Sequence, residues 1–241
     1  MSGRLYGVGV GPGDPELLTV KAVRIIGQSP VVAFFAKAGR RGNARGIVER
    51  WLGANQTELP LYYPMTTESR FDEPPYREAL ADFYRKSAAA IGMHLEAGRD
   101  VALLSEGDPL LYGSFMHLFV RLRERFPVTI VPGVPSLCGA WGVAEAAMAW
   151  GDDALVVLPA TLPHDELVRR LALADAAVIM KLGRNLPRAR DALREAGMAE
   201  RAIYVERATM AGERVLPLAE ANAESAPYFS LILVPGQGRR P

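Results

Sequence analysis

Three short segments rich in glycine and proline carry the residues best suited to bind a small polar molecule. The first runs Gly7-Val8-Gly9-Val10-Gly11-Pro12-Gly13-Asp14-Pro15, the second Glu106-Gly107-Asp108-Pro109 and the third Pro132-Gly133-Val134-Pro135-Ser136. Each belongs to the end of a short apolar run that predicts a β-strand. In a parallel sheet all three would emerge at the carboxyl edge of the strands, where open α/β sheets bind ligands. We therefore expect backbone groups of these loops to contact a ligand.

Two of the segments contain an Asp-Pro pair, which suits the start of a helix. Asp14 and Asp108 would each cap a helix that begins at the following proline. If capping were the only role of Asp108, asparagine should replace it with little loss, because it caps about equally well. Three such loops at one edge favour an additional role in ligand binding for Asp108, whereas Asp14 is expected mainly to cap.

The first segment invites a dinucleotide-binding interpretation, which the residues do not support. A G-x-G-x-x-G pattern that begins at Gly7 needs a third glycine where Pro12 stands. The carboxylate that should hold a ribose about 20 residues later is also absent, since no acidic residue separates the expected second strand from Glu49. The missing carboxylate equally disfavours the common nucleotide-fold methyltransferases.

Composition places the chain among ordinary globular proteins. It has 241 residues, of which 49% are hydrophobic and 23% charged, and its net charge is +1. So small a net charge predicts no binding to nucleic acid or to an anionic membrane. The single cysteine, Cys138, excludes an intrachain disulfide and a multi-cysteine metal site, and suits a reducing compartment. Without a signal peptide or a continuous apolar span in the sequence, we expect a soluble cytoplasmic protein.

Short apolar runs alternate with helical patterns, which predicts βαβ units and a parallel sheet. In the first half we expect strands at 5–10, 31–35, 58–61, 101–105 and 128–131, and helices at 15–26, 44–52, 76–97 and 110–125. After an alanine-rich helix at 137–149 we expect strands at 154–158, 176–180, 202–206, 214–216 and 230–234, and helices at 165–173 and 186–196. The pattern predicts two α/β domains, residues 1–130 with a parallel sheet and residues 131–241 with a mixed sheet. Residues 62–75 have neither period and are expected to form a functional loop.

Three stretches of this sequence match known signatures in order and spacing over nearly the whole chain. They are Val8-Gly9-Val10-Gly11-Pro12-Gly13-Asp14-Pro15-Glu16-Leu17-Leu18-Thr19, Glu106-Gly107-Asp108-Pro109-Leu110-Leu111-Tyr112-Gly113 and Val131-Pro132-Gly133-Val134-Pro135-Ser136. Together they resemble the tetrapyrrole methylases. That resemblance implies two α/β domains with S-adenosylmethionine (SAM) in the cleft between them, S-adenosylhomocysteine as product, a tetrapyrrole substrate, no metal, and a homodimer.

Carried over position by position, the resemblance also implies a donor site. It consists of Pro12 at the adenosine end; Glu106, Gly107 and Asp108 at the methionine end; Leu111 beside them; Pro135 and Ser136 from the third segment; and Met180 and Ala208 over the adenine. At Pro135 the family more often has threonine, so a hydroxyl is lost while backbone contacts remain. At Ala208 glycine is commoner.

Within the family, residues 62–67, 107–115 and 151–159 most resemble members that methylate the C-20 meso carbon of precorrin-2, giving precorrin-3A in cobalamin biosynthesis. The alternative substrate is cobalt-factor II, the cobalt-containing analogue. From other classes, a dinucleotide-dependent oxidoreductase and a non-enzymatic tetrapyrrole-binding module stay open.

The expected substrate contacts are basic and aromatic. Arg40, Arg41 and Arg45 lie with Lys37 in a run without acids, and guanidinium groups suit the carboxylates of a tetrapyrrole. A solvated surface loop explains this run equally well. Tyr112, in the second segment, is also expected beside the substrate. The motifs contain no evident base for the meso proton, so the catalytic residue stays unknown.

Overall fold

The computed structural model describes residues 1–64, 74–221 and 226–238. The chain divides into two compact units, Met1–Pro135 and Ser136–Pro241, so the expected division after residue 130 would fall inside the last strand of the first unit. Each unit is an α/β fold, which confirms the expected fold class. Of the expected loop at 62–75, residues 65–73 lie outside the described part of the chain.

The first unit contains a five-stranded sheet in which every neighbouring pair is parallel. Its order is β3 (Thr57–Tyr63), β2 (Val31–Lys37), β4 (Val101–Ser105), β1 (Leu5–Gly9) and β5 (Val128–Val131). β4 is buried along its whole length, as its continuous apolar sequence requires. Because all five strands run the same way, the loops after β4, β1 and β5 leave the sheet at one edge.

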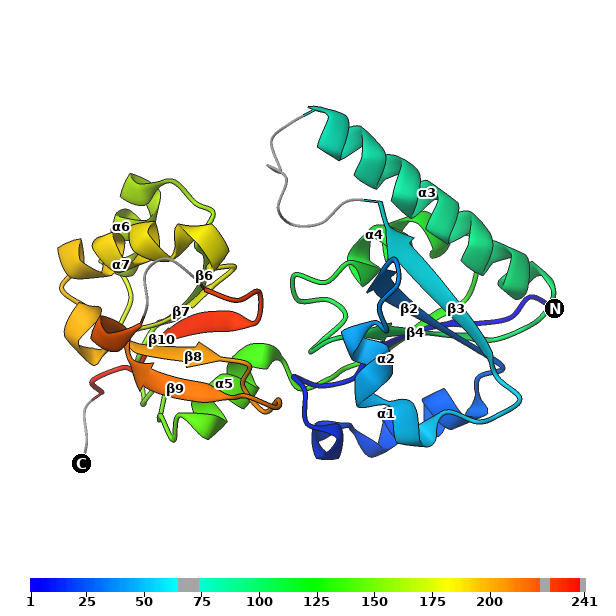
Figure 1. The fold of residues 1–241 in the computed structure, drawn as a ribbon, viewed down its shortest axis with the longest axis horizontal. Coiled ribbons are helices and arrows are strands. Elements are labelled where there is room, and N and C mark those ends of the chain that lie inside the picture. Colours follow the sequence, from blue (N-terminus) through cyan, green and yellow to red (C-terminus); the bar gives the residue numbers. More distant parts are fainter. Residues whose placement is uncertain (65–73, 222–225, 239–241) are drawn as a thin grey trace. The chain divides into compact units, whose positions relative to one another are not determined.

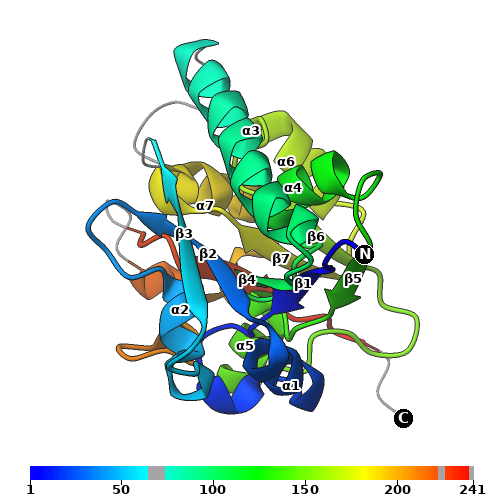
Figure 2. The same ribbon diagram turned by 90° about the vertical axis from the view of Figure 1, so that its right-hand side faces the viewer.

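Helices cover both faces of this sheet (Figures 1 and 2). α1 (Val20–Gln28) and α2 (Asn43–Ile47) pack on one face, around a core that includes Val8, Val32 and Leu104. α3 (Pro74–Glu96) and α4 (Phe115–Leu122) pack on the other face. Successive strand residues alternate between these two cores, as the period of a strand requires.

Two expected helices begin later than their sequence patterns indicate. At 15–26 the chain forms a 3₁₀ turn, Pro15–Leu17, and α1 starts only after Thr19, whose hydroxyl caps the amide of Ala22 at 3.1 Å. At 110–125 the helix begins at Phe115. Tyr112 has a left-handed backbone, with φ of 54°, which ends any helical path begun at residue 110. Both changes lengthen loops at the carboxyl edge.

The second unit contains a mixed sheet of five strands. Its order is β6 (Leu155–Pro159), β7 (Ala176–Met180), β10 (Ser230–Val234), β8 (Ile203–Glu206) and β9 (Arg214–Pro217). β10 runs antiparallel to both of its neighbours, β7 and β8. β7 and β8 therefore run in the same direction, and their carboxyl ends lie at the same edge.

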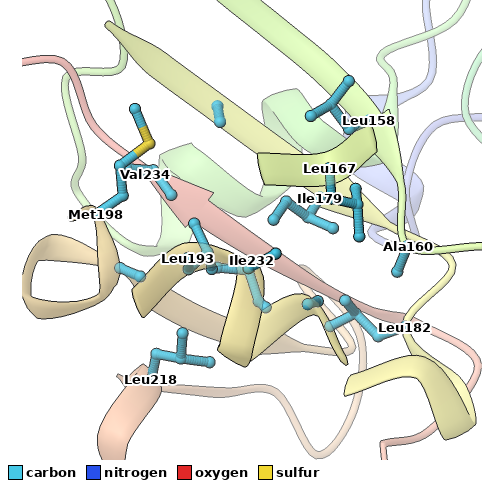
Figure 3. Packing of buried hydrophobic residues seen from close by; sticks show 14 of the residues in the cluster. Leu158, Ala160, Leu167, Ile179, Leu182, Leu193, Met198, Leu218, Ile232 and Val234 are labelled. Atoms are coloured by element: carbon cyan, nitrogen blue, oxygen red, sulfur yellow. The ribbon is translucent and has the colours of Figure 1, made fainter. Parts of the chain in front are cut away.

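Helices cover both faces of this second sheet as well. α6 (His164–Leu171) and α7 (Leu186–Glu195) enclose a core with Leu193, Ile179 and Ile232, shown in Figure 3. α5 (Ser136–Val143) packs on the opposite face and is shorter than the expected helix at 137–149. No helix among residues 1–64, 74–221 and 226–238 combines the length and apolar character needed to cross a membrane.

Candidate functional site

The three loops named from the sequence meet at the carboxyl edge of β4, β1 and β5. Backbone hydrogen bonds hold the first loop to the second: the amide of Val10 donates to the carbonyl of Ser105 at 2.9 Å, and the amide of Gly107 donates to the carbonyl of Gly11 at 2.8 Å. A single antiparallel bridge pairs Gly11 with Gly107. The first and second loops therefore form one continuous backbone surface.

Glycines allow the third loop to join this surface. A Cβ atom built on Gly9 would lie 2.5 Å from the backbone nitrogen of Gly133, and one built on Gly133 would lie 2.2 Å from the carbonyl oxygen of Gly107. Those distances are far below van der Waals contact. Gly107 also has a left-handed backbone, with φ of 64°. The three loops thus pack backbone against backbone, which no side chain at these positions would permit.

Asp108 links the second loop to the third through both carboxylate oxygens. Its Oδ1 accepts from the amide of Leu110 at 2.9 Å, which is a local capping bond. Its Oδ2 accepts from the amide of Gly133 at 3.2 Å, across 25 residues of sequence. Asp14, by contrast, caps the amide of Glu16 at 2.8 Å within its own turn. The predicted capping role is correct for Asp14 and incomplete for Asp108.

Glu106 contacts the start of α2. Its side chain has an exposed surface, yet desolvation by the surrounding protein raises the pKa of its carboxyl, while hydrogen bonds with the backbone of Ala44 and the side chain of Asn43 act in the opposite direction. The preceding residue, Ser105, is 6% exposed, and its hydroxyl has no hydrogen-bond partner among the described residues. The edge therefore contains polar groups that the surrounding fold only partly satisfies.

The end of the second loop is fixed by hydroxyl groups that sequence reasoning missed. The hydroxyl of Ser114 lies 2.5 Å from that of Tyr63 and accepts from that of Tyr84 at 3.1 Å. The ring of His117 stacks on Tyr84 at 4.3 Å. Desolvation, with a smaller contribution from a neighbouring arginine, lowers the pKa of His117 and favours its neutral form. No spacing rule predicts this network, since its members come from β3, α3, the loop before α4 and α4 itself.

Leu111 and Tyr112 lie on the exposed part of the second loop. Leu111 is 36% exposed and Tyr112 is 41% exposed. Both are accessible at the edge where the loops converge, as a ligand-contacting residue must be.

The basic residues expected to bind the substrate differ in whether they pair with acidic residues. Arg45 forms a two-pronged bond with Glu58, at 2.9 and 3.0 Å, and a third bond with Glu49 at 2.9 Å. These bonds raise the pKa of Arg45, and only 14% of its side chain is exposed. Arg41 also pairs with Glu49, at 2.6 Å, on the surface. The run itself contains no acidic residue, but Glu49 and Glu58 lie beside it in the folded chain, so Arg45 takes part in structural ion pairs.

Arg40 and Lys37 differ from Arg45. Both are exposed, and neither forms an ion pair with another described residue. Lys37 is the last residue of β2, so it lies at the carboxyl edge of the sheet. These two cations stay available to a ligand.

The remaining expected donor residues come from the first and third loops and from the second unit. Pro12 is in the first loop, Pro135 lies between β5 and α5, and Ser136 is the first residue of α5. Met180 ends β7 and Ala208 follows β8, and both pack against the core that α5 covers. Since β7 and β8 run in the same direction, these last two residues lie at one edge of the second sheet.

Known proteins are similar to this chain in sequence and in fold. Residues 4–222 match the family described as Tetrapyrrole (Corrin/Porphyrin) Methylases. A Precorrin-2 C(20)-methyltransferase of Sinorhizobium sp is 57% identical over 239 residues, covering 99% of this chain and 98% of that protein. A Cobalt-precorrin-2 C(20)-methyltransferase of Salmonella typhimurium is 34% identical over 240 residues, with 97% of each chain covered. The chain spans about half, 47%, of the length of some other curated relatives.

A solved structure extends the comparison to the fold. Uroporphyrin-III C-methyl transferase from Thermus thermophilus, complexed with S-adenosylhomocysteine, has a TM-score of 0.68 and 26% identity, covering 97% of this chain and 92% of that one. The signatures in the three loops, the two α/β units and these matches agree. This chain belongs to the tetrapyrrole methylase family.

Proposed function

We propose that this protein transfers the methyl group of SAM to the C-20 meso carbon of precorrin-2, giving precorrin-3A. The observation that carries the proposal is the 57% identity over nearly the full length of both chains to a relative named for this reaction. Family membership excludes the dinucleotide-dependent oxidoreductase weighed above. The relative named for the cobalt-containing substrate is less similar, at 34% identity, so the metal-free substrate is preferred.

The residues at the carboxyl edge fit a donor with a charged amino-acid end. Gly9, Gly107 and Gly133 bring three stretches of backbone together, and glycine lets a ligand approach the backbone closely. Asp108 and Glu106 are acidic groups in the same loop that suit an ammonium group. We assign the methionine end of the donor to this edge, beside Leu111, and the adenosine end to Pro12, Pro135, Ser136, Met180 and Ala208.

The protein's main task in this reaction is to orient the tetrapyrrole and the methyl donor relative to each other. When bound, SAM supplies an electrophilic methyl on a sulfonium, so that forming the bond to C-20 breaks the sulfur–methyl bond and releases the meso proton. Holding the meso carbon in line with that methyl at about 3–3.5 Å lowers the entropic barrier to reaction. Rigid loops suit such a task, and the bonds of Asp108 and Ser114 fix both ends of the second loop.

Exposed cations near this edge suit a substrate that carries several carboxylates. Arg40 and Lys37 have no competing acid among the described residues, whereas Arg45 is occupied by Glu49 and Glu58. We therefore assign substrate recognition to Arg40 and Lys37, with Arg41 as a weaker contributor, and place Tyr112 beside the tetrapyrrole. Arg45 supports α2.

We also propose that the protein is a homodimer in the cytoplasm. The family resemblance supports the homodimer, and the lone cysteine, Cys138, suits a reducing compartment. Sedimentation equilibrium tests the homodimer: a mass near twice 26.2 kDa is expected, and a single-chain mass at all concentrations would contradict it.

Calorimetric titration tests the donor assignment. We expect S-adenosylhomocysteine to bind and NAD to give no heat, because the glycine pattern and the ribose carboxylate of a dinucleotide site are both missing. Binding of NAD without binding of S-adenosylhomocysteine would overturn the proposed function.

A further inference from the structure

The turn that follows β8 contains unusual backbone strain. Arg207 has φ of 47° and Thr209 has φ of 63°, so two residues with side chains adopt the left-handed conformation on either side of Ala208. A β-branched residue such as Thr209 is a pronounced outlier there. Strained backbone of this kind persists only when its surroundings hold it, and it clusters at ligand-binding sites. Yet residues 207–209 contain no glycine that would have signalled such a turn in the sequence.

Backbone bonds account for part of what holds this turn. The amide of Arg207 donates to the carbonyl of Phe229 at 2.8 Å, which ties the start of the turn to the segment before β10. The carbonyl of Arg207 accepts from the amide of Met210 at 2.8 Å. The amide of Thr209 donates to the carboxylate of Glu213 at 2.6 Å. These three bonds therefore hold Arg207 and Thr209, the two residues with left-handed backbone.

The buried carboxylate of Glu206 supplies the remaining anchor. Only 8% of its side chain is exposed. Its Oε1 accepts from the hydroxyl of Tyr204 at 2.9 Å, while its Oε2 lies 3.5 Å from the guanidinium of Arg214 and 3.7 Å from that of Arg207. Glu206 also lies opposite Arg214 in the register of β8 and β9. One carboxylate thus contacts residues on both sides of the turn.

Replacing a buried ion pair by well-packed hydrophobic residues is often neutral or even stabilising, so stability alone does not account for the buried carboxylate of Glu206. Hydrophobic side chains could stabilise β8 and β9 equally well, but they would not hold Arg207 in a left-handed conformation. We propose that Glu206 is a positioning residue for the donor: it keeps the strained turn at Arg207–Thr209 ready for the adenosine part of the ligand at Ala208. This inference rests on the proposed function.

The consequence is an affinity gain that requires no contact between Glu206 and the donor. Without the carboxylate, the turn keeps the bonds of Arg207, Met210 and Thr209 but loses one anchor. The turn then adopts ordinary backbone conformations more often, and the donor must restore the strained conformation when it binds. The strain of one such residue corresponds to an affinity loss of about 5- to 150-fold. Substrate recognition, which we assign to Arg40 and Lys37 in the first unit, should be unaffected.

The experiment is calorimetric titration of the full chain with S-adenosylhomocysteine, using Glu206→Gln. Glutamine keeps an acceptor for Tyr204 but no charge for Arg214. We expect the donor Kd to rise about 5- to 150-fold and the tetrapyrrole KM at saturating SAM to change less than about twofold. The matched control is Glu195→Gln, which removes a carboxylate from α7 in the same unit, where it pairs with His164 on the surface. Its Kd should equal that of the unaltered protein.

A second variant separates positioning from general damage. In Glu206→Gln with Arg207→Gly, glycine adopts a left-handed backbone without strain, so the donor affinity should recover toward the original value. If Glu206→Gln does not fold, Arg214→Gln removes an exposed partner of the same carboxylate and should weaken donor binding in the same direction. An unchanged Kd in the folded single variants, or no recovery with glycine, would overturn the inference alone. Failure of the unaltered protein to bind S-adenosylhomocysteine would overturn the proposed function as well.

Discussion

Replacing Asp108 with asparagine should lower the stability of the first unit, although asparagine is as good a helix cap as aspartate. The carboxylate accepts one bond from the amide of Leu110 at 2.9 Å and another from the amide of Gly133 at 3.2 Å. Asparagine has a single acceptor oxygen. Whichever bond it keeps, its NH₂ group faces the other amide, so that two donors oppose each other.

The magnitude follows from these two bonds. A hydrogen bond to a charged group contributes about 1.5–3 kcal/mol, and a neutral one about 0.5–1.5 kcal/mol. Exchanging two of the first kind for one of the second loses about 1.5–5.5 kcal/mol. Because Asp108 is only half-buried, we expect the lower part of this range, about 1.5–3 kcal/mol, as the loss in the free energy of unfolding for Asp108→Asn. Asp108→Ala removes both acceptors and should lower it further. The control is Asp14→Asn, in which the amide oxygen can keep the capping bond to Glu16, so its loss should be less than about 0.5 kcal/mol.

The assay is thermal unfolding of the ligand-free protein, with donor Kd measured well below the melting temperature. For a domain of this size, we expect Asp108→Asn to lower Tm by about 3–8 °C and Asp14→Asn to lower it by less than about 2 °C. We also expect donor Kd to rise for Asp108→Asn, because the second and third loops are no longer tied together. Equal Tm and equal Kd for the two asparagine variants would refute the bridging role derived for Asp108.

Three further outcomes follow from the same geometry. Gly133→Ala should destabilise the protein by about 1–3 kcal/mol and weaken donor binding, because its Cβ would collide with backbone 2.2 Å away; chemical denaturation measures the first effect and calorimetry the second, and an unperturbed variant would contradict the packing. Arg40→Gln should raise the tetrapyrrole KM roughly threefold to tenfold and make this KM less sensitive to salt, whereas Arg45→Gln should chiefly lower the free energy of unfolding, by about 1–2 kcal/mol. Steady-state kinetics at two ionic strengths and chemical denaturation test this contrast, and it is contradicted if the two variants behave alike. Burial and the neighbouring Glu206 raise the pKa of Tyr204 to about 12, so its neutral form stabilises the fold below pH 10, and this contribution is lost as the pH rises from about 10 to 12. The free energy of unfolding should therefore fall less steeply with pH over that range in Tyr204→Phe than in the unaltered protein, and equal slopes for the two proteins would argue against this.

The carboxyl edge of the first sheet could be predicted from the sequence, because its determinants are local. Apolar runs define the strands, and Gly9, Gly107 and Gly133 mark places where backbones approach closely. The order of the strands then brings the three loops together. The same reasoning gave two α/β units and a mixed second sheet, since alternation of strands and helices is visible along the chain.

What the sequence could not indicate depends on contacts between distant residues. Arg45 lies in a run without acids, yet Glu58 reaches it from the neighbouring strand. The helix expected from residue 110 is shortened by the backbone of Tyr112, which carries no glycine signal. Arg207 and Thr209 likewise adopt a left-handed backbone without a glycine to signal it in the sequence. In each case tertiary contacts override a local pattern that, taken alone, favours something simpler.

Product analysis is the most direct test of methyl transfer to C-20. Purified protein is incubated without oxygen with precorrin-2 and SAM that carries a ¹³C-labelled methyl group, and in parallel with cobalt-factor II. We expect one labelled methyl, bonded to the C-20 meso carbon, with faster turnover of the metal-free substrate. A labelled methyl at any other carbon, or no transfer to either tetrapyrrole by protein that binds S-adenosylhomocysteine, would contradict it.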